Sequence, residues 1–296
     1  MPQRARAAIA VALLLLLTGC GGFAQTDPSL GDAPRADSPP NGSVGAESNL
    51  SDVTFPEGFT RTEIDIATAR ERSVTFLRTE PVTGAAFERF RAGAYADYEY
   101  EANPDRTRFR LDVHNGYVDV TRSDVYVDDG VRYARSARNR EIAFEASNGS
   151  VVETRFRAAD SMWAVASRIV TVADVRAVRT VEESDRRLIR YTVTGVAVPE
   201  ATDVRGYLTV DRDGVIREAR LAYTQAGESK RFEYVVGSRA AGERVAPPAW
   251  LPAARTDAVP ESDDGGGTAA WIEASARAAA HPVPTARPAR IGGGST

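Results

Sequence analysis

The side chain placed most clearly for chemistry is the thiol of Cys20, the sole cysteine of the chain. It follows an apolar run over residues 9–17 and two small residues, Thr18 and Gly19, and two arginines precede the run. The run is too short to cross a bilayer, which takes about 20 apolar residues, and has the length of a signal-peptide core. Cleavage between Gly19 and Cys20 would make Cys20 the new N-terminus, whose thiol can carry a thioether-linked lipid.

This order of residues resembles a lipoprotein signal peptide with its lipobox, Leu17-Thr18-Gly19-Cys20. The resemblance implies a signal peptide over residues 1–19, a signal-peptidase site at Gly19 and Cys20, and lipidation of Cys20. Because stable anchoring takes two lipid chains, a two-chain lipid is expected, which would hold the protein on the extracytoplasmic face of the cell membrane. A signal peptide with an incidental cysteine and an uncleaved N-terminal anchor remain alternatives. Export could be by either route, because one alanine separates the arginines that a twin-arginine signal needs side by side.

Other candidates for chemistry are few. With Cys20 lipidated, the mature chain has no thiol for a disulfide, a nucleophile or a metal site. His114 lies near a predicted strand end and His281 in a predicted tail, so no triad or two-histidine metal site is expected. The stretch Asp211-Arg212-Asp213-Gly214 resembles half of a calcium loop, but it runs directly into apolar residues, which favours a hairpin turn.

The sequence also lacks the motifs that would indicate an enzyme. It contains no G-x-G-x-x-G, no P-loop and no G-x-S-x-G, and no pair of carboxylates is set apart by its spacing as acid and base. We therefore predict no catalytic residue, no cofactor and no bound metal, and we predict that the protein is not an enzyme. Three sequons could accept an N-linked glycan, at Asn41, Asn49 and Asn148.

Composition limits the class of partner. The 296 residues carry 37 basic and 41 acidic side chains, and Lys230 is the only lysine. Residues 1–19 hold two arginines and no acid, so their removal takes the formal net charge from −4 to −6. A mildly acidic chain is a poor nucleic-acid ligand, so no nucleic acid is expected. The preference for arginine over lysine fits a high-GC genome or adaptation to salt and leaves the host open. We expect a monomer.

The distribution of small and polar residues divides the chain into four parts. After the leader, residues 20–54 are rich in Gly, Pro and Ser and predict a flexible tether carrying the lipidated Cys20. Residues 55–252 show regular apolar patterns and predict one folded domain of ample size for a core. Residues 253–296 lose the periodicity and predict a disordered tail.

Apolar periodicity predicts a mostly β domain with few helices. Helical spacing predicts one or two short helices within residues 63–90, the second around residues 85–90, and another helix over 158–170 with Asp160 as a candidate cap. The remaining patterns alternate with period two and are separated by turn signals such as Asp128-Asp129-Gly130 and Asn148-Gly149. Strands are predicted over residues 95–101, 108–113, 117–121, 125–127, 131–135, 141–144, 151–156, 175–181, 188–193, 204–210, 215–223 and 231–236.

Turns recur at short intervals, which favours antiparallel over parallel strands. The predicted fold class is α+β, mostly antiparallel β, in the form of a curved sheet or half-barrel with helices packed on or in its concave side.

The layout resembles the haloarchaeal surface lipoproteins of unknown function, which combine a lipobox, a polar tether, Phe-Pro-x-Gly, a helix and curved antiparallel strands. The residues that carry this resemblance are Leu17–Cys20, Phe55–Gly58, Val127–Ala134, Val210–Arg217 and Pro248–Leu251. More distantly, the order of helix and curved sheet resembles the LolA-like lipoprotein-carrier fold, in which an incomplete barrel wraps an apolar cavity closed by helices. That resemblance implies binding of an acyl or isoprenoid chain and carries over no site residue.

Three hypotheses for function follow. The leading one is a lipid-anchored protein whose half-barrel cavity binds an apolar small molecule or a lipidated protein, since apolar cavities are usual ligand sites. The alternative is an interaction or scaffold module of the cell envelope, with a solid core and contacts on an outer face. A surface hydrolase would need a convergent nucleophile and base that the sequence does not offer.

Overall fold

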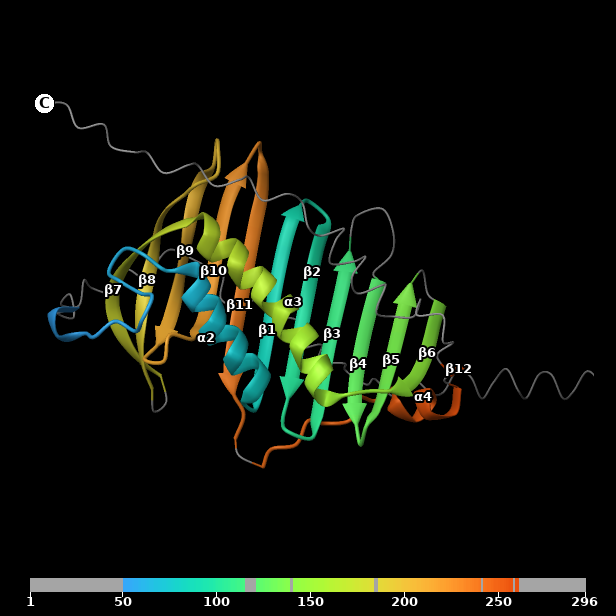
Figure 1. Cartoon of the computed structure of the whole chain (residues 1–296). Helices are drawn as coiled ribbons and strands as arrows, with labels where there is room; N and C mark the ends of the chain where they lie inside the picture. Colours follow the sequence, from blue (N-terminus) through green and yellow to red (C-terminus); the bar gives the residue numbers. More distant parts are fainter. Residues whose placement is uncertain are drawn as a thin grey trace, which may run out of the picture. The chain divides into compact units, whose positions relative to one another are not determined.

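A single large sheet forms the body of the protein (Figure 1). The computed structural model describes residues 50–114, 121–138, 141–183, 186–240, 242–257 and 259–260. The strands are β1 (Val82–Arg91), β2 (Ala94–Ala102), β3 (Arg106–His114), β4 (Thr121–Asp128), β5 (Val131–Arg138), β6 (Glu141–Asn148), β7 (Ala173–Glu183), β8 (Arg186–Val196), β9 (Thr202–Asp211), β10 (Ile216–Gln225), β11 (Glu228–Ser238) and β12 (Val259–Pro260). The helical elements are η1 (Leu50–Asp52), α2 (Ile66–Thr79), α3 (Val151–Val172) and α4 (Leu251–Asp257).

The strand order is β12-β6-β5-β4-β3-β2-β1-β11-β10-β9-β8-β7, so the sheet is unclosed. Every neighbouring pair is antiparallel except the two-residue β12, which runs parallel to β6. The sheet is curved, and α2 and α3 lie on its concave side (Figure 1). The predicted fold class, α+β with mostly antiparallel strands in a curved sheet, is confirmed.

Two meanders, β1–β6 and β7–β11, make up the sheet and join where β1 pairs with β11. The chain therefore has to travel from β6 near one edge to β7 at the other. Ten strand spacings separate these two strands in the order, or about 48 Å along the sheet. The 22 residues of α3 span about 33 Å of that distance. A long helix lying diagonally across the concave side is thus the connection that this topology requires (Figure 1).

Each long helix begins at a side-chain cap. The Asp65 carboxylate accepts a hydrogen bond from the Thr68 amide at 2.7 Å and starts α2, and the Ser150 hydroxyl accepts from the Glu153 amide and starts α3. Such caps satisfy amides that have no partner in the first turn. The cap predicted at Asp160 is wrong, because Asp160 lies in the middle of α3 and pairs with Arg78 of α2 at 3.0 Å.

Two secondary-structure predictions are also wrong. Residues 85–90, predicted as helix, belong to β1, which lies between β2 and β11 and is hydrogen-bonded on both sides. Residues 151–156, predicted as a strand after a hairpin at Asn148-Gly149, form the first turns of α3. In both places a short apolar run is compatible with the spacing of a helix and with the alternation of a strand. Contacts with the rest of the fold decide which of the two forms. The predicted strand over 117–121 falls almost wholly outside the described residues.

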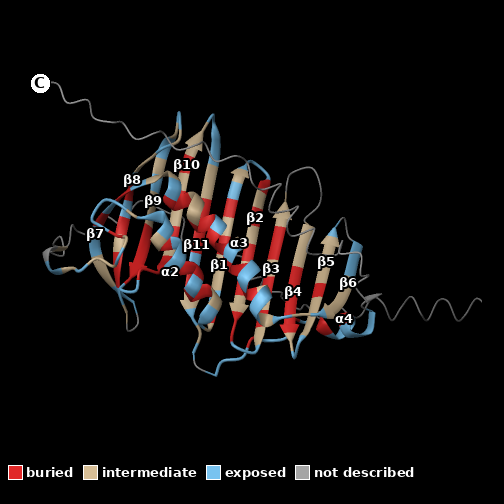
Figure 2. Ribbon diagram, viewed as in Figure 1, coloured by how far each residue is buried: buried red, intermediate tan, exposed pale blue. Residues whose placement is uncertain are grey.

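Buried side chains fill the space between the helices and the sheet (Figure 2). Met162 and Ile169 of α3 are fully buried, as are Tyr100 of β2 and Tyr234 of β11. A side-chain carbon added at Gly84 of β1 would come within 3.1 Å of the Met162 methyl group, so helix and sheet are in close contact there. This part of the concave side is a packed core.

A buried arginine ties α2 to α3. Arg155 of α3 is 5 % exposed and donates hydrogen bonds to the carbonyls of Leu77 and Glu80 at the end of α2. The Tyr100 hydroxyl also donates to the Leu77 carbonyl, at 2.9 Å. Carbonyls at a helix C-terminus lack partners within the helix and attract cations, so both donors stabilise the end of α2.

The fold continues beyond the predicted domain boundary at residue 252. Leu251 of α4 and Val245 pack on Tyr126, on the face of the sheet that lies away from α2 and α3. The ring of Trp250 stacks on Phe144 at 6.2 Å, and its Nε1 donates to Asp124 at 2.7 Å. The first residues of the predicted tail are therefore part of the domain.

Candidate functional site

Of the predicted modification sites, the structure describes only Asn148. Gly19, Cys20, Asn41 and Asn49 lie outside the described residues. Asn148 ends β6 with its side chain exposed. Its glycosylation remains a prediction.

In the described part of the chain, side chains of α2 and α3 pack against the concave side of the sheet. Its polar groups around Glu88 are paired with one another. Glu88 of β1 is 1 % exposed, accepts a hydrogen bond from the Tyr98 hydroxyl at 2.7 Å and pairs with Arg168 of α3. Burial raises the pKa of Glu88, and the Arg168 cation opposes that rise. This is a structural link between helix and sheet.

The structure does offer a polar cleft of about 750 Å³ beside α2. It is bounded by the C-terminal half of α2 and by one end of the β7–β11 meander, at the β7–β8 connection, the β9–β10 turn and the end of β11. Five arginines line it, namely Arg72, Arg186, Arg187, Arg212 and Arg217. Five carboxylates do so as well, namely Glu71, Glu80, Glu182, Asp211 and Asp213.

A buried ion pair lies at the base of this cleft. Both Arg217 and Asp211 are over 90 % buried, and the Arg217 Nη2 lies 2.6 Å from the Asp211 Oδ2. The Arg217 guanidinium carbon also lies 3.9 Å from the centre of the Phe76 ring of α2, a cation–π distance. These contacts fix the plane and position of the guanidinium.

One donor of this guanidinium remains unused. The Arg217 Nη1 is buried and has no hydrogen-bond partner among the described residues, and the same holds for the nearby Tyr234 hydroxyl. Burial raises the pKa of Tyr234, so the hydroxyl keeps its proton and stays a donor. A buried donor without an acceptor is costly, and of these two residues Arg217 lines the cleft.

The rim of the cleft is more open. Arg212 has a side chain that is 90 % exposed, and only a long contact of 3.8 Å joins it to Asp213. Arg187 has a similar 3.8 Å contact with Glu182. Arg186 donates to the Ser238 hydroxyl at 2.9 Å. Exposed ion pairs contribute little to stability, so Arg187 and Arg212 can exchange their present carboxylates for another anion at low cost.

The Asp211–Gly214 turn is a hairpin turn, as predicted, and not a calcium loop. One Asp211 oxygen accepts from the amides of Asp213 and Val215, each at 2.9 Å, and the other accepts from Arg217. A carboxylate used in this way is not free to bind a cation. No group of three or more metal-ligating side chains comes together within the described part of the chain.

His114 is the last residue of β3 and is half-buried. Its ring stacks on Tyr95 at 5.3 Å between centroids, and its Nδ1 is buried without a partner among the residues described. No nucleophile lies against it in the contacts that the structure records. Among the described helices, none has the length and hydropathy needed to cross a membrane.

Sequence reasoning missed the cleft, although part of its signal was visible. Arg186 and Arg187 are adjacent at a predicted turn, and Arg217 interrupts an apolar strand. By themselves, such patterns indicate only a charged sheet face in contact with solvent. The convergence of α2 with the turns of a distant meander needed the fold.

Comparisons with known proteins give a distant likeness only. No family model and no curated protein sequence matches the chain. Among solved structures, the chain is similar to the crystal structure of MucB, with 19 % identity, a TM-score of 0.30 and coverage of 62 % of this chain and 63 % of that one. It is also similar to MucB in complex with MucA(peri), with 18 % identity and a TM-score of 0.28 over 62 % and 59 % of the two chains.

A third match is the complex of Pseudomonas aeruginosa MucA/MucB, with 18 % identity, a TM-score of 0.28 and coverage of 63 % and 60 %. The chain thus spans about three fifths of the length of the structures it matches. Likeness at this level does not extend to function.

Proposed function

We propose that the chain is a membrane-anchored, extracytoplasmic interaction module that binds a carboxylate-bearing segment of a partner protein in the polar cleft. The observation that carries this proposal is the Arg217 guanidinium at the base of the cleft, which is fixed by Asp211 and Phe76 and keeps one buried donor without an acceptor. Arginine is well suited to binding carboxylates because its planar fork matches their geometry.

The surroundings support a polypeptide ligand. A volume of about 750 Å³ accommodates a short peptide segment, and the lining carries as many carboxylates as arginines. Arg187 and Arg212 at the rim would attract the acidic group, while Glu71 and Glu80 on α2 would favour basic groups elsewhere in the same segment. Such a mixed lining gives selectivity more than affinity.

A peptide-binding experiment tests this use of the cleft. The mature chain from Gly21 onward is titrated against fluorescent peptides of alternating Glu and Ser, alternating Lys and Ser, and Ser alone. We expect the glutamate peptide to bind best, and the double variant Arg187→Glu/Arg212→Glu to bind it at least tenfold more weakly. The control variant Arg157→Glu/Arg244→Glu makes the same charge change at exposed sites that do not line the cleft. Equal losses in the two variants would contradict the proposal.

The anchor is tested separately. We expect wild-type protein to enter the detergent phase on Triton X-114 partitioning, and the Cys20→Ser variant to stay in the aqueous phase, because only the cysteine can carry a thioether lipid. Mass spectrometry of the N-terminal peptide should find the lipid on Cys20, and the tether variant Ser43→Ala should behave as wild type. Detergent partitioning of Cys20→Ser would point to an uncleaved anchor instead.

The apolar-ligand hypothesis makes a different prediction. Because side chains of α2 and α3 occupy the concave side, an acyl chain would have to displace part of that layer. Native mass spectrometry of the protein purified from its host tests this directly. A bound lipid of defined mass would favour the carrier function, and the bare protein mass would favour the interaction module.

A further inference from the structure

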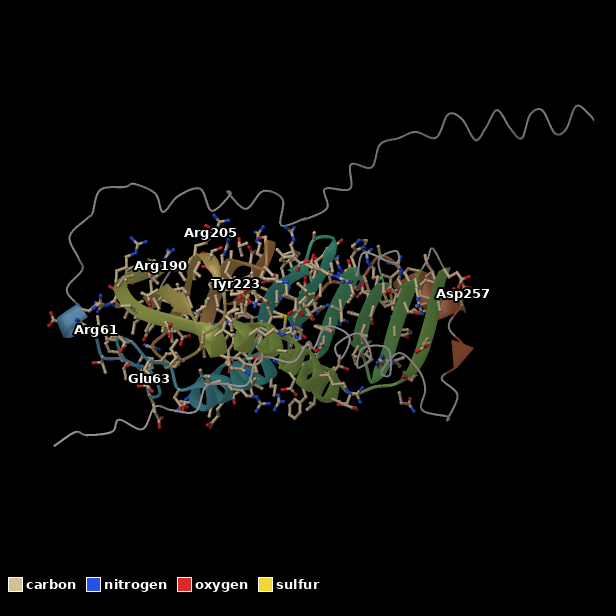
Figure 3. The ribbon with its side chains drawn as sticks, turned by 90° about the horizontal axis from the view of Figure 1, so that it is seen from above. Arg61, Glu63, Arg190, Arg205, Tyr223 and Asp257 are labelled. Atoms are coloured by element: carbon tan, nitrogen blue, oxygen red, sulfur yellow. The ribbon has the colours of Figure 1, made fainter. Side chains whose placement is uncertain are left out.

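The outer face of β7, β8 and β9 holds a cluster of arginines that the cleft does not use. We call Arg176, Arg179, Arg190 and Arg205 the outer arginine cluster. Ala177 and Tyr191 are buried against the core, so their neighbours Arg176 and Arg190 point to the opposite side of the sheet. Figure 3 shows Arg190 and Arg205 projecting from the face that lies away from α2 and α3.

Within the part of the chain that the structure describes, these four side chains form no recorded ion pair with a carboxylate. Arg179 lies directly opposite Arg190 in the register of β7 and β8. Arg190 makes one recorded contact, with its guanidinium 3.9 Å from the centre of the Tyr207 ring. Like charges placed directly opposite each other in a sheet repel, and the contact with the Tyr207 ring is the one favourable contact recorded for Arg190 among the described residues.

The nearest carboxylate on the neighbouring strand is already occupied. Glu218 of β10 accepts from the Tyr207 hydroxyl at 2.6 Å and from Arg220 at 2.7 Å. Arginine keeps its charge at every physiological pH, so the cluster cannot neutralise itself by losing protons. An anion from outside the folded unit is the remaining source of neutralisation.

We propose that the outer arginine cluster docks the domain on an anionic membrane surface. The argument for a membrane combines the charge of the cluster with the point where the chain enters the fold. Leu50 of η1 packs against the core, and η1 lies against β7, the strand that carries Arg176 and Arg179. The described chain therefore begins at the edge strand that carries two of the four arginines.

The length of the intervening chain fits this arrangement. Residues 21–49 separate Cys20 from Leu50. A Gly- and Ser-rich coil of that length averages about 30 Å between its ends and reaches about 100 Å when extended. A tether of this predicted kind would keep the domain close to the membrane at a high effective concentration, where weak electrostatic attraction is sufficient to orient it. The choice of a membrane rests on the anchoring part of the proposed function.

Vesicle binding by unlipidated protein tests the cluster without depending on the anchor. The mature chain from Gly21 is titrated with phosphatidylcholine vesicles that contain or lack phosphatidylglycerol, at low and at physiological salt. We expect binding only to the anionic vesicles, weakening with salt. Each arginine near such a surface contributes about fivefold in affinity, so Arg176→Gln/Arg179→Gln/Arg205→Gln should bind about 100-fold more weakly.

The controls separate this proposal from the cleft. The triple variant should keep the thermal unfolding midpoint and the peptide affinity of wild type, and Arg157→Gln/Arg244→Gln should bind vesicles within about threefold of wild type. Equal binding to neutral vesicles, no binding to anionic vesicles, or a folded triple variant that binds like wild type would each overturn the proposal. Cluster-dependent binding of the glutamate peptide without vesicle binding would also overturn it, since the cluster would then dock a protein.

Discussion

Two pairs of like-charged residues lie opposite each other on the outer face of the sheet, and the pairs differ in the oppositely charged groups around them. Asp97 of β2 is opposite Asp112 of β3, and Arg179 of β7 is opposite Arg190 of β8. The acidic pair lies within a dense set of ion pairs, in which Asp112 receives two hydrogen bonds of 2.8 Å from Arg122. The basic pair has no carboxylate partner among the described residues.

The difference follows from the chemistry of the two groups. A carboxyl group can take up a proton when its surroundings disfavour the charge. Burial, with repulsion from Glu99 and Asp112, raises the pKa of Asp97 to about 6. A guanidinium group keeps its charge at accessible pH and cannot relieve repulsion by losing a proton. The region over β2–β4 is therefore neutralised internally and holds strands together, whereas the region over β7–β9 is left available for an external anion.

The largest effect is expected from breaking the internally paired region at Asp124. This carboxylate is 1 % exposed and accepts from Arg108 at 3.0 Å and from the Trp250 Nε1 at 2.7 Å. Asp124→Ala leaves both donors without an acceptor, so we expect the free energy of unfolding to fall by about 3 kcal/mol. Urea unfolding followed by tryptophan fluorescence measures this loss.

A matched control is Asp160→Ala on α3. Asp160 also pairs with two arginines, Arg70 and Arg78, but its side chain is 49 % exposed. Pairs of this kind contribute less than about 1 kcal/mol. If Asp124→Ala and Asp160→Ala lower the free energy of unfolding equally, burial does not make the ion pairs of Asp124 more stabilising than those of Asp160.

The next effect concerns pH at Asp97. A folded-state pKa of about 6 is above the unfolded value near 4, so the folded protein binds the extra proton between these pH values. The free energy of unfolding should therefore fall as pH rises from about 4 to about 6 and then level off. Because Asp97 is partly solvated, we expect the fall to be about 1–2 kcal/mol.

Replacing this carboxyl group should remove the pH dependence. Asp97→Asn should be more stable than wild type by about 1 kcal/mol at pH 7 and equal to it near pH 4. Glu63→Gln, an exposed carboxylate of the N-terminal segment, serves as the control. Equal stability of Asp97→Asn and wild type at pH 7 would contradict the raised pKa of Asp97.

The smallest effect is expected in the basic region. Arg179→Thr removes one member of the opposed pair and keeps a residue that suits a strand, so it should stabilise the domain by about 0.5 kcal/mol at low salt. Added salt should shrink the gain. Arg176→Thr is the control, since Arg176 faces Thr192. Destabilisation by Arg179→Thr would mean that the opposed arginines have a structural role.

The fold class could be predicted from the sequence because the alternation of apolar and polar residues along a strand depends only on neighbouring residues. The strands over β2, β5, β8 and β10 repeat apolar and polar residues with few interruptions, and the turns at Asp128–Gly130 and Asp211–Gly214 carry their own signals. The errors at residues 85–90 and 151–156 arose where a short run fits two periods. There, β1 is set by pairing with β11, whose residue Ser238 is opposite Val82, and Ser150 and the contacts of Arg155 set the start of α3.

The candidate anchor, the alternation of strands and the lack of recognised catalytic motifs can be predicted from the sequence, because each depends only on residues close together in the chain. Only the tertiary structure decided which charges meet. The cleft combines Phe76 of α2 with Arg217 of β10, and the opposed pairs depend on strand register, in which a shift of one residue would turn every side chain to the other face. Strand register and packing decide whether a charged side chain is paired, buried or unpaired. The order of residues along the chain does not show this.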